Sequence, residues 1–154
     1  GSDARAIESE ARDLIAGGHV ELRGFVPDKQ MDTVWRESSV LALPSRGEGF
    51  GLVYVEAMRH RLPVLASTID AAPEISVDGE TGFNVSPDSP TEIADRLIQL
   101  LGTPELARTL GESGYHRWKS HFTYEHFRKR FSAVVRRFLA LKGPMDIVSS
   151  AGMD

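Results

Sequence analysis

Short apolar segments alternate with amphipathic helical segments along this chain, and this alternation restricts its fold more than any other feature. The strand candidates are residues 20–26, 40–43, 62–68 and 82–85. Residues 40–43 form a continuous apolar run, which is typical of a strand buried on both faces of a parallel sheet. Because short loops separate the segments, the sequence predicts an α/β fold, a Rossmann-like parallel sheet with flanking helices.

Apolar spacing and capping residues also predict the helices. They are expected over residues 3–17, 28–37, 51–61, 89–101, 103–115 and 123–141. The last helix is long and carries a stripe at 3.6-residue spacing, which predicts that the stripe lies in the core. The stripe consists of Tyr124, Phe127, Phe131, Val134, Val135 and Phe138. Residues 1–142 are expected to form one partial domain, followed by a frayed polar tail at 143–154.

Composition excludes several classes of function. The net charge of −4 gives no reason to propose a nucleic-acid partner. With no cysteine, the chain has no disulfide, zinc–thiolate site or cysteine nucleophile. This composition is compatible with a reducing cytosol, and the expected location is cytoplasmic. The five histidines lack metal-ligand spacing, so no metal is expected. Gly1-Ser2 is similar to the remnant of a cleaved tag, so the natural protein is expected to start further upstream.

The chemistry-bearing segment runs from Pro44 to Glu56, where a predicted strand ends, a glycine-rich turn follows and a helix begins. Ligands of open α/β sheets bind at this carboxyl edge, and a helix start favours phosphate. The turn contains Glu48, and Glu56 follows on the helix. Carboxylates accept hydrogen bonds from hydroxyl groups and repel phosphate. A diphosphate flanked by two polyols, as in a nucleoside diphosphate sugar, satisfies both requirements.

Two other interpretations of this segment stay open. In the first interpretation, the two glutamates are solvated surface acids and the glycines merely form a tight turn. In the second, the segment binds a dinucleotide, with Asp70 after the next strand as the ribose-binding acid. The second interpretation makes the chain part of an oxidoreductase.

The strings EGFGLVYVEAM, LPVLAS and PEISVDGETGFNV closely resemble the donor-binding half of family-4 retaining glycosyltransferases of the GT-B fold. The hallmark of that family is a pair of glutamates separated by seven residues, which Glu48 and Glu56 match. The resemblance covers residues 5–140. It implies that the chain is the C-terminal, nucleotide-sugar-binding domain of a hexosyltransferase and is truncated on its N-terminal side.

The resemblance also implies a role for individual residues. Glu48, the residue expected to be catalytic, would hold hydroxyl groups of the donor sugar, and Glu56 would bind the ribose. The expected donor-binding residues are Gly49, Phe50, Gly51, Leu52, Glu56, Val26 and Met31, of which Val26 and Met31 would lie near the nucleobase. Transfer would proceed with retention and without a metal or other cofactor. The chain alone is expected to be inactive because the acceptor-binding domain is missing; a non-catalytic nucleotide-binding or assembly module is the alternative.

The chain departs from the family pattern at several positions. Arg61 stands where family members often have glycine, at a helix end that forms a left-handed turn. The pair Ala71-Ala72 stands where family members often have two glycines. The strands that carry a diphosphate-gripping arginine and lysine are missing, which leaves Lys29 and Arg46 as candidate substitutes.

The missing strands would occupy the centre of the sheet, so bare strand edges are expected. Strand exchange, homodimerisation or relocation of the first strand next to the second would repair them. The last helix also carries a basic cluster, which is interpreted as a solvated face or, alternatively, as a peripheral membrane contact of the full-length enzyme. The cluster comprises Arg128, Lys129, Arg130, Arg136 and Arg137.

Overall fold

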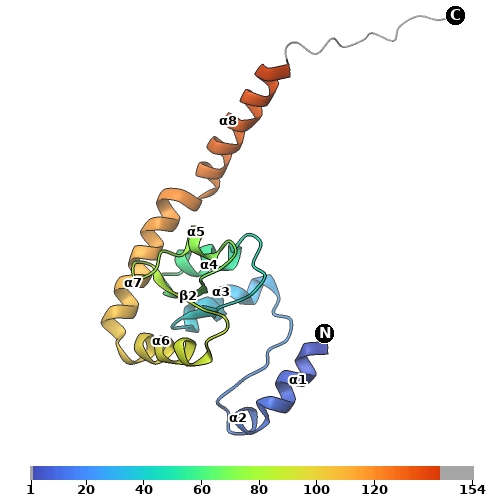
Figure 1. Ribbon diagram of the computed structural model, residues 1–154, viewed down its shortest axis with the longest axis vertical. Coiled ribbons are helices and arrows are strands. Elements are labelled where there is room, and N and C mark those ends of the chain that lie inside the picture. The colour runs from blue at the N-terminus through green and yellow to red at the C-terminus, as the bar shows by residue number, and fades with distance from the viewer. Residues whose placement is uncertain (1, 143–154) are drawn as a thin grey trace, which may run out of the picture. The chain divides into compact units, whose positions relative to one another are not determined.

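Three parallel strands form one sheet in the order β1-β2-β3. They are β1 (Leu41–Leu43), β2 (Val64–Ser67) and β3 (Gly82–Val85). Figure 1 labels the central strand, β2. The computed structural model describes residues 2–142. In the register, Leu65 of the central strand pairs with Ala42 on one side and Phe83 on the other. The predicted parallel α/β sheet with flanking helices is confirmed for these strands.

Helices precede, connect and follow the strands. They are α1 (Ser2–Glu10), α2 (Arg12–Ala16), α3 (Asp28–Glu37), α4 (Leu52–Arg59), α5 (Ala72–Ile75), α6 (Pro90–Gly102), α7 (Pro104–Arg117), the π-helix η1 (Trp118–Phe122) and α8 (Tyr124–Lys142). The chain forms two compact units, which divide between Glu37 and Ser38. The first unit holds α1, α2 and α3; the second holds the sheet and the remaining helices.

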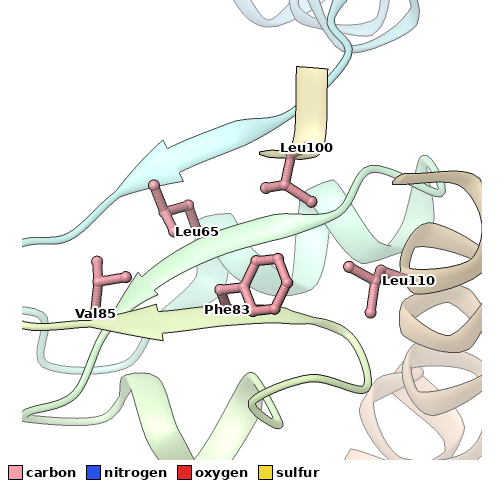
Figure 2. Packing of buried hydrophobic residues seen from close by; sticks show 5 residues of the cluster. All are labelled: Leu65, Phe83, Val85, Leu100 and Leu110. Atoms are coloured by element: carbon pink, nitrogen blue, oxygen red, sulfur yellow. The ribbon is translucent and has the colours of Figure 1, made fainter. Parts of the chain in front are cut away.

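The core of the second unit lies between the sheet and the helices that follow it (Figure 2). Its buried members come from β2, β3, α6 and α7, and they are Leu65, Phe83, Val85, Leu100 and Leu110. Burial of each such side chain contributes about 1.5–3 kcal/mol to folding. Neighbours along a strand point to opposite faces, so Val64 and Ala66 face the other side of the sheet, and both are fully buried. The central strand β2 is therefore covered on both faces.

The start of α6 has the sequence of a capping box, Ser89-Pro90-Thr91-Glu92, and forms it with one difference. The Ser89 hydroxyl accepts a hydrogen bond from the Glu92 amide at 3.4 Å, as expected. The Glu92 carboxylate accepts from the amide of Ser86 at 3.0 Å instead of from Ser89. The helix start is thus tied to the end of β3, which fixes the loop that leaves the sheet.

Several predictions for the first part of the chain are wrong. Residues 20–26 form no strand, and the helix expected over residues 3–17 is broken into α1 and α2 at Ala11. Alternation encodes the tendency to form a strand, but a strand also needs a neighbour for its backbone hydrogen bonds. Because residues 20–26 form no strand, the expected pairing of this segment with β1 is ruled out. Strand exchange and homodimerisation stay predictions.

The burial expected for the first sheet strand is also wrong. Ala42 is exposed and its neighbours in β1 are only half-buried, whereas all of β2 is buried. The reason is position: β1 lies at an edge of the described sheet, with β2 as its partner.

The long last helix is confirmed, but the burial expected for its apolar stripe is wrong. Phe127 and Phe131 are 55% and 57% exposed, and Val134 is 66% exposed. The helix leaves the layers of the second unit after η1 (Figure 1), so that within residues 38–142 the stripe remains largely exposed. The expected tail at residues 143–154 lies outside the described residues.

Arg61 adopts the left-handed backbone conformation that its position in the family pattern predicts, with φ of 59°. A side chain in this region costs free energy that glycine avoids. Contacts with α7 offset the cost: the guanidinium Nε lies 2.9 Å from the Glu112 carboxylate, and its carbon lies 3.8 Å from the Tyr115 ring centre. A Cβ at Gly111 would lie 2.0 Å from the Arg61 carbonyl oxygen. The α7 backbone therefore approaches this turn closely.

Gly111→Ala is expected to destabilise the chain by about 1–3 kcal/mol, because the added methyl group meets backbone that cannot give way. Helix propensity alone would predict a gain of up to about 1 kcal/mol. Gly102→Ala at the end of α6 is the matched control, since a Cβ there meets no atom within 4 Å. Urea unfolding followed by circular dichroism measures both. Equal stability of Gly111→Ala and the unmodified chain would refute the close approach.

Candidate functional site

The loops that leave the three parallel strands are joined to one another at the carboxyl edge of the sheet. The amide of Ala71, after β2, donates to the carbonyl of Glu48, after β1, at 3.3 Å. Arg46, also after β1, forms an ion pair with Asp88, which follows β3. Parallel strands end at the same edge, and open α/β sheets bind their ligands there. The predicted glycine-rich segment therefore lies where a ligand site is expected.

Glu48 holds the turn before α4 through its own side chain. Its Oε1 accepts hydrogen bonds from the amide of Gly51 at 2.8 Å and from that of Phe50 at 3.3 Å. A carboxylate is favoured at a helix start, where the amides lack helical partners and the dipole is positive. The half-buried Glu48 thus supplies a fixed negative charge within the turn.

Gly51 is required in this turn for two separate reasons. Its φ is 62°, in the left-handed region that favours glycine. A Cβ at this position would also lie 2.5 Å from Cδ1 of Ile75 and 2.8 Å from the Tyr54 ring. By contrast, a Cβ at Gly47 or Gly49 would meet no atom within 4 Å, so intramolecular packing does not explain those two glycines.

Tyr54 anchors the first turn of α4 to the end of β1. It is fully buried, and its hydroxyl donates to the carbonyl of Leu43 at 2.7 Å. Burial raises the pKa of Tyr54 above its ordinary value, and the charge of Glu48 acts in the same direction. The phenol therefore remains a neutral donor at physiological pH, and the strand end and helix start are held together.

Glu56 lies farther along α4 and is exposed. The buried face of the helix is formed by Tyr54, Ala57 and Met58, so Glu56 lies on the opposite, solvent-facing side. The loop that carries Glu48 lies at the N-terminal end of α4, and Glu56 lies about one helical turn further along. Convergence of the two carboxylates on one ligand stays a prediction.

The structure separates the expected site residues into two groups. Glu48, Gly49, Phe50, Gly51, Leu52 and Glu56 belong to the second unit. Val26 and Met31 belong to the first unit, where both are half-buried and Val26 borders a surface hollow beside α3. Lys29, one proposed substitute for the diphosphate-gripping residues, is exposed on α3. The other, Arg46, has Asp88 as its partner.

A surface hollow of about 280 Å³ borders the glycine turn. It is lined by Gly49, Phe50, Leu52, Val55, Ala71, Glu74, Ile75 and Phe122. Phe50 and Leu52 are 82% and 69% exposed. Binding pockets for small molecules usually occupy roughly 300–1,000 Å³, so the volume of this hollow lies just below that range.

Sequence reasoning missed three residues that shape this edge: Tyr54, Ile75 and Arg117. Tyr54 and Ile75 were indistinguishable from ordinary core residues, although Tyr54 follows Gly51 at the spacing that aims a side chain back over the turn. Arg117 is separated from the segment by more than 60 positions, and no local signal connects them. Across residues 2–142, histidines and acidic side chains nowhere gather in threes that could hold a metal ion.

The sequence matches the family described as "Glycosyl transferases group 1" over residues 1–117. This chain belongs to that family. An uncharacterized glycosyltransferase of Methanocaldococcus jannaschii is 34% identical over 114 residues, which cover 74% of this chain and 30% of that protein. The interpretation as part of a dinucleotide-dependent oxidoreductase is therefore set aside.

Solved structures agree with this assignment. Sucrose-phosphate synthase from Thermosynechococcus elongatus superimposes with a TM-score of 0.83 at 29% identity, covering 92% of this chain and 35% of that one. Anabaena HepE in complex with UDP-glucose gives 0.79 at 21% identity, covering 87% of this chain and 36% of that one. The fold is thus that of GT-B glycosyltransferases, and the chain spans about a third of the length of these relatives. None of the helices within residues 2–142 is long and apolar enough to cross a membrane.

Tyr54→Phe is expected to lower the free energy of unfolding by about 1 kcal/mol, because a buried hydroxyl loses its bond to the Leu43 carbonyl. Tyr124→Phe is the matched control: Tyr124 is 77% exposed on α8, and its change should stay within about 0.5 kcal/mol. Urea denaturation measures the free energy of unfolding of both variants and of the unmodified chain. Indistinguishable stabilities for both would show that Tyr54 does not anchor the helix to the strand.

Proposed function

We propose that this chain binds a nucleoside diphosphate sugar at the turn formed by Glu48–Leu52 and the start of α4. The observation that carries the proposal is the Glu48 carboxylate fixed by the Gly51 amide at 2.8 Å, at the edge where the loops after β1, β2 and β3 are joined. The family assignment supports it. So does the likeness in fold to a protein solved with UDP-glucose.

The turn offers complementary groups to the two halves of such a ligand. The amides at the start of α4 and the positive end of the helix dipole favour the diphosphate. Glu48 uses Oε1 for its own turn, and the remaining lone pairs of the carboxylate can accept hydrogen bonds from sugar hydroxyls. Glu56, one turn into the helix, would accept from the ribose. Arg46 forms an ion pair with Asp88, so it would help to bind the diphosphate only by interacting with both groups at once.

We further propose that the bound sugar is transferred with retention, as in family-4 enzymes, without a metal, and that the acceptor site lies in a separate domain of a longer protein. The incomplete hollow beside Phe50 and Leu52 supports this division, because both side chains are largely exposed. The exposed stripe of α8 supports it as well, since an apolar helix face of this size is usually covered. By itself the chain would bind donor but transfer little or no sugar; its expected cytoplasmic location stays a prediction.

Ligand class can be tested by measuring the melting temperature with UDP, UDP-glucose and, for comparison, NAD. A ligand at 100 times its Kd stabilises a folded protein by about 2.7 kcal/mol. UDP and UDP-glucose should raise the melting temperature, whereas NAD should not. Binding of UDP-glucose without transfer by the longer protein would favour the non-catalytic module instead.

Glu56→Ala is expected to abolish the shift produced by UDP, because a hydrogen bond to a charged group contributes about 1.5–3 kcal/mol. Glu105→Ala is the control, since Glu105 is also an exposed helical glutamate and lies on α7. A UDP shift that persists in Glu56→Ala would count against the ribose role. The melting temperature without ligand shows whether either variant is itself destabilised.

Glu48→Gln tests binding of the sugar separately from binding of the nucleotide. The glutamine Oε1 can still accept from the amides of Gly51 and Phe50, so the turn is preserved. Hydrogen bonds to an ionised acceptor are about twice as strong as neutral ones. Because Glu48 contacts only the sugar in this scheme, the affinity for UDP should stay nearly unchanged, whereas the additional affinity for UDP-glucose should fall. Calorimetric titration with both ligands measures this, and undiminished preference for UDP-glucose would contradict the role of Glu48.

A further inference from the structure

A single arginine holds the last carbonyls of the short helix α5. Arg117 donates from Nε to the carbonyl of Ile75 at 2.7 Å and from Nη2 to the carbonyl of Glu74 at 2.8 Å. The carbonyls at the end of a helix have no partner within it, and Glu74 and Ile75 are the last residues of α5. Their carbonyls therefore need a donor from outside the helix. The planar fork of the guanidinium matches two adjacent carbonyls, which a lysine cannot reproduce.

The other contacts of α5 lead to the glycine turn. The amide of Ala71, directly before the helix, donates to the Glu48 carbonyl at 3.3 Å. The Ile75 side chain packs against Gly51 so closely that a Cβ at Gly51 would lie 2.5 Å from its Cδ1. Both ends of α5 thus contact the turn that carries Glu48. The position of α5 therefore limits the position of the turn.

Arg117 stands at the junction of two kinds of helix. It is the last residue of α7, and the π-helix η1 begins at the next residue. The ring of Phe122, at the end of η1, lies 5.6 Å from the guanidinium carbon and lines the same hollow as Ile75. Single π-helical turns often occur at functional sites. Here the π-helix brings Phe122 beside α5, and the guanidinium contacts both.

We infer that Arg117 is a positioning residue of the donor site: it fixes α5, and through α5 it fixes the Glu48–Gly51 turn in the conformation that binds the donor. This inference rests on the proposed function for its consequence in binding. The coupling itself does not, because it concerns contacts within the chain. Arg117 touches no ligand in this scheme; it acts through the two carbonyls, Ile75 and the Ala71 amide.

Hydrogen exchange of the full chain tests the coupling without any ligand. In Arg117→Ala, amides of residues 70–76 and of residues 48–54 should both exchange at least about tenfold faster, since both segments lose the same anchor. Residues 93–100 of α6 should exchange as before. Arg117→Lys should restore part of the protection, and Arg108→Ala, an exposed arginine on the same helix, should leave all three segments unchanged. Unchanged exchange of residues 48–54 in Arg117→Ala would overturn the inference, as would equal acceleration in α6.

Calorimetric titration with UDP-glucose tests the consequence for binding. At a temperature where the variants remain folded by circular dichroism, Arg117→Ala should bind at least tenfold more weakly than the unmodified chain, Arg117→Lys should fall between them, and Arg108→Ala should match the unmodified chain. Wild-type affinity in a folded Arg117→Ala would overturn the inference. If the unmodified chain binds neither UDP nor UDP-glucose, the proposed function fails, and the exchange experiment still decides the coupling.

Discussion

The parallel pairing of β1, β2 and β3 is the constraint on which the candidate site depends. It makes these three strands end at the same edge, so residues far apart in sequence meet there. The pairing alone would leave three loose loops. The Ala71 amide, the Arg46–Asp88 ion pair and the Tyr54 hydroxyl join these loops to one another and to the strand ends. The Glu48 turn is therefore held from several sides before any ligand binds.

Local sequence predicted the parts of this arrangement that depend on local interactions. The turn before α4 was predictable because Gly51 and Glu48 act within a few residues, through a left-handed conformation and a carboxylate–amide bond. The start of α6 was predictable from Ser89 and Glu92 for the same reason. In each case the interaction that decides the structure lies within one turn of the residue that signals it.

The errors arose where a pattern needs a distant partner. Residues 20–26 alternate as a strand does, but alternation does not supply a neighbour to accept and donate backbone hydrogen bonds. The stripe of α8 has the spacing of a buried face, yet spacing records only that the face is apolar, not what covers it. Arg117 gave no signal at all, because its partners are backbone carbonyls, which every residue has. These features depend on tertiary contacts that short-range reasoning cannot predict.

The departures from the family pattern share a structural explanation in α7. Arg61 takes a conformation that suits glycine, and Glu112 and Tyr115 of α7 bind its side chain there. Ala71-Ala72 replaces a flexible pair with the start of α5, and Arg117 of α7 holds the end of that helix. In both places a residue with less backbone freedom is combined with side-chain contacts from the same helix. Contacts from α7 thus fix both connections of β2: the turn at Arg61 before the strand, and α5 after the strand at the carboxyl edge. Any ligand bound at that edge must fit a turn whose shape is already set.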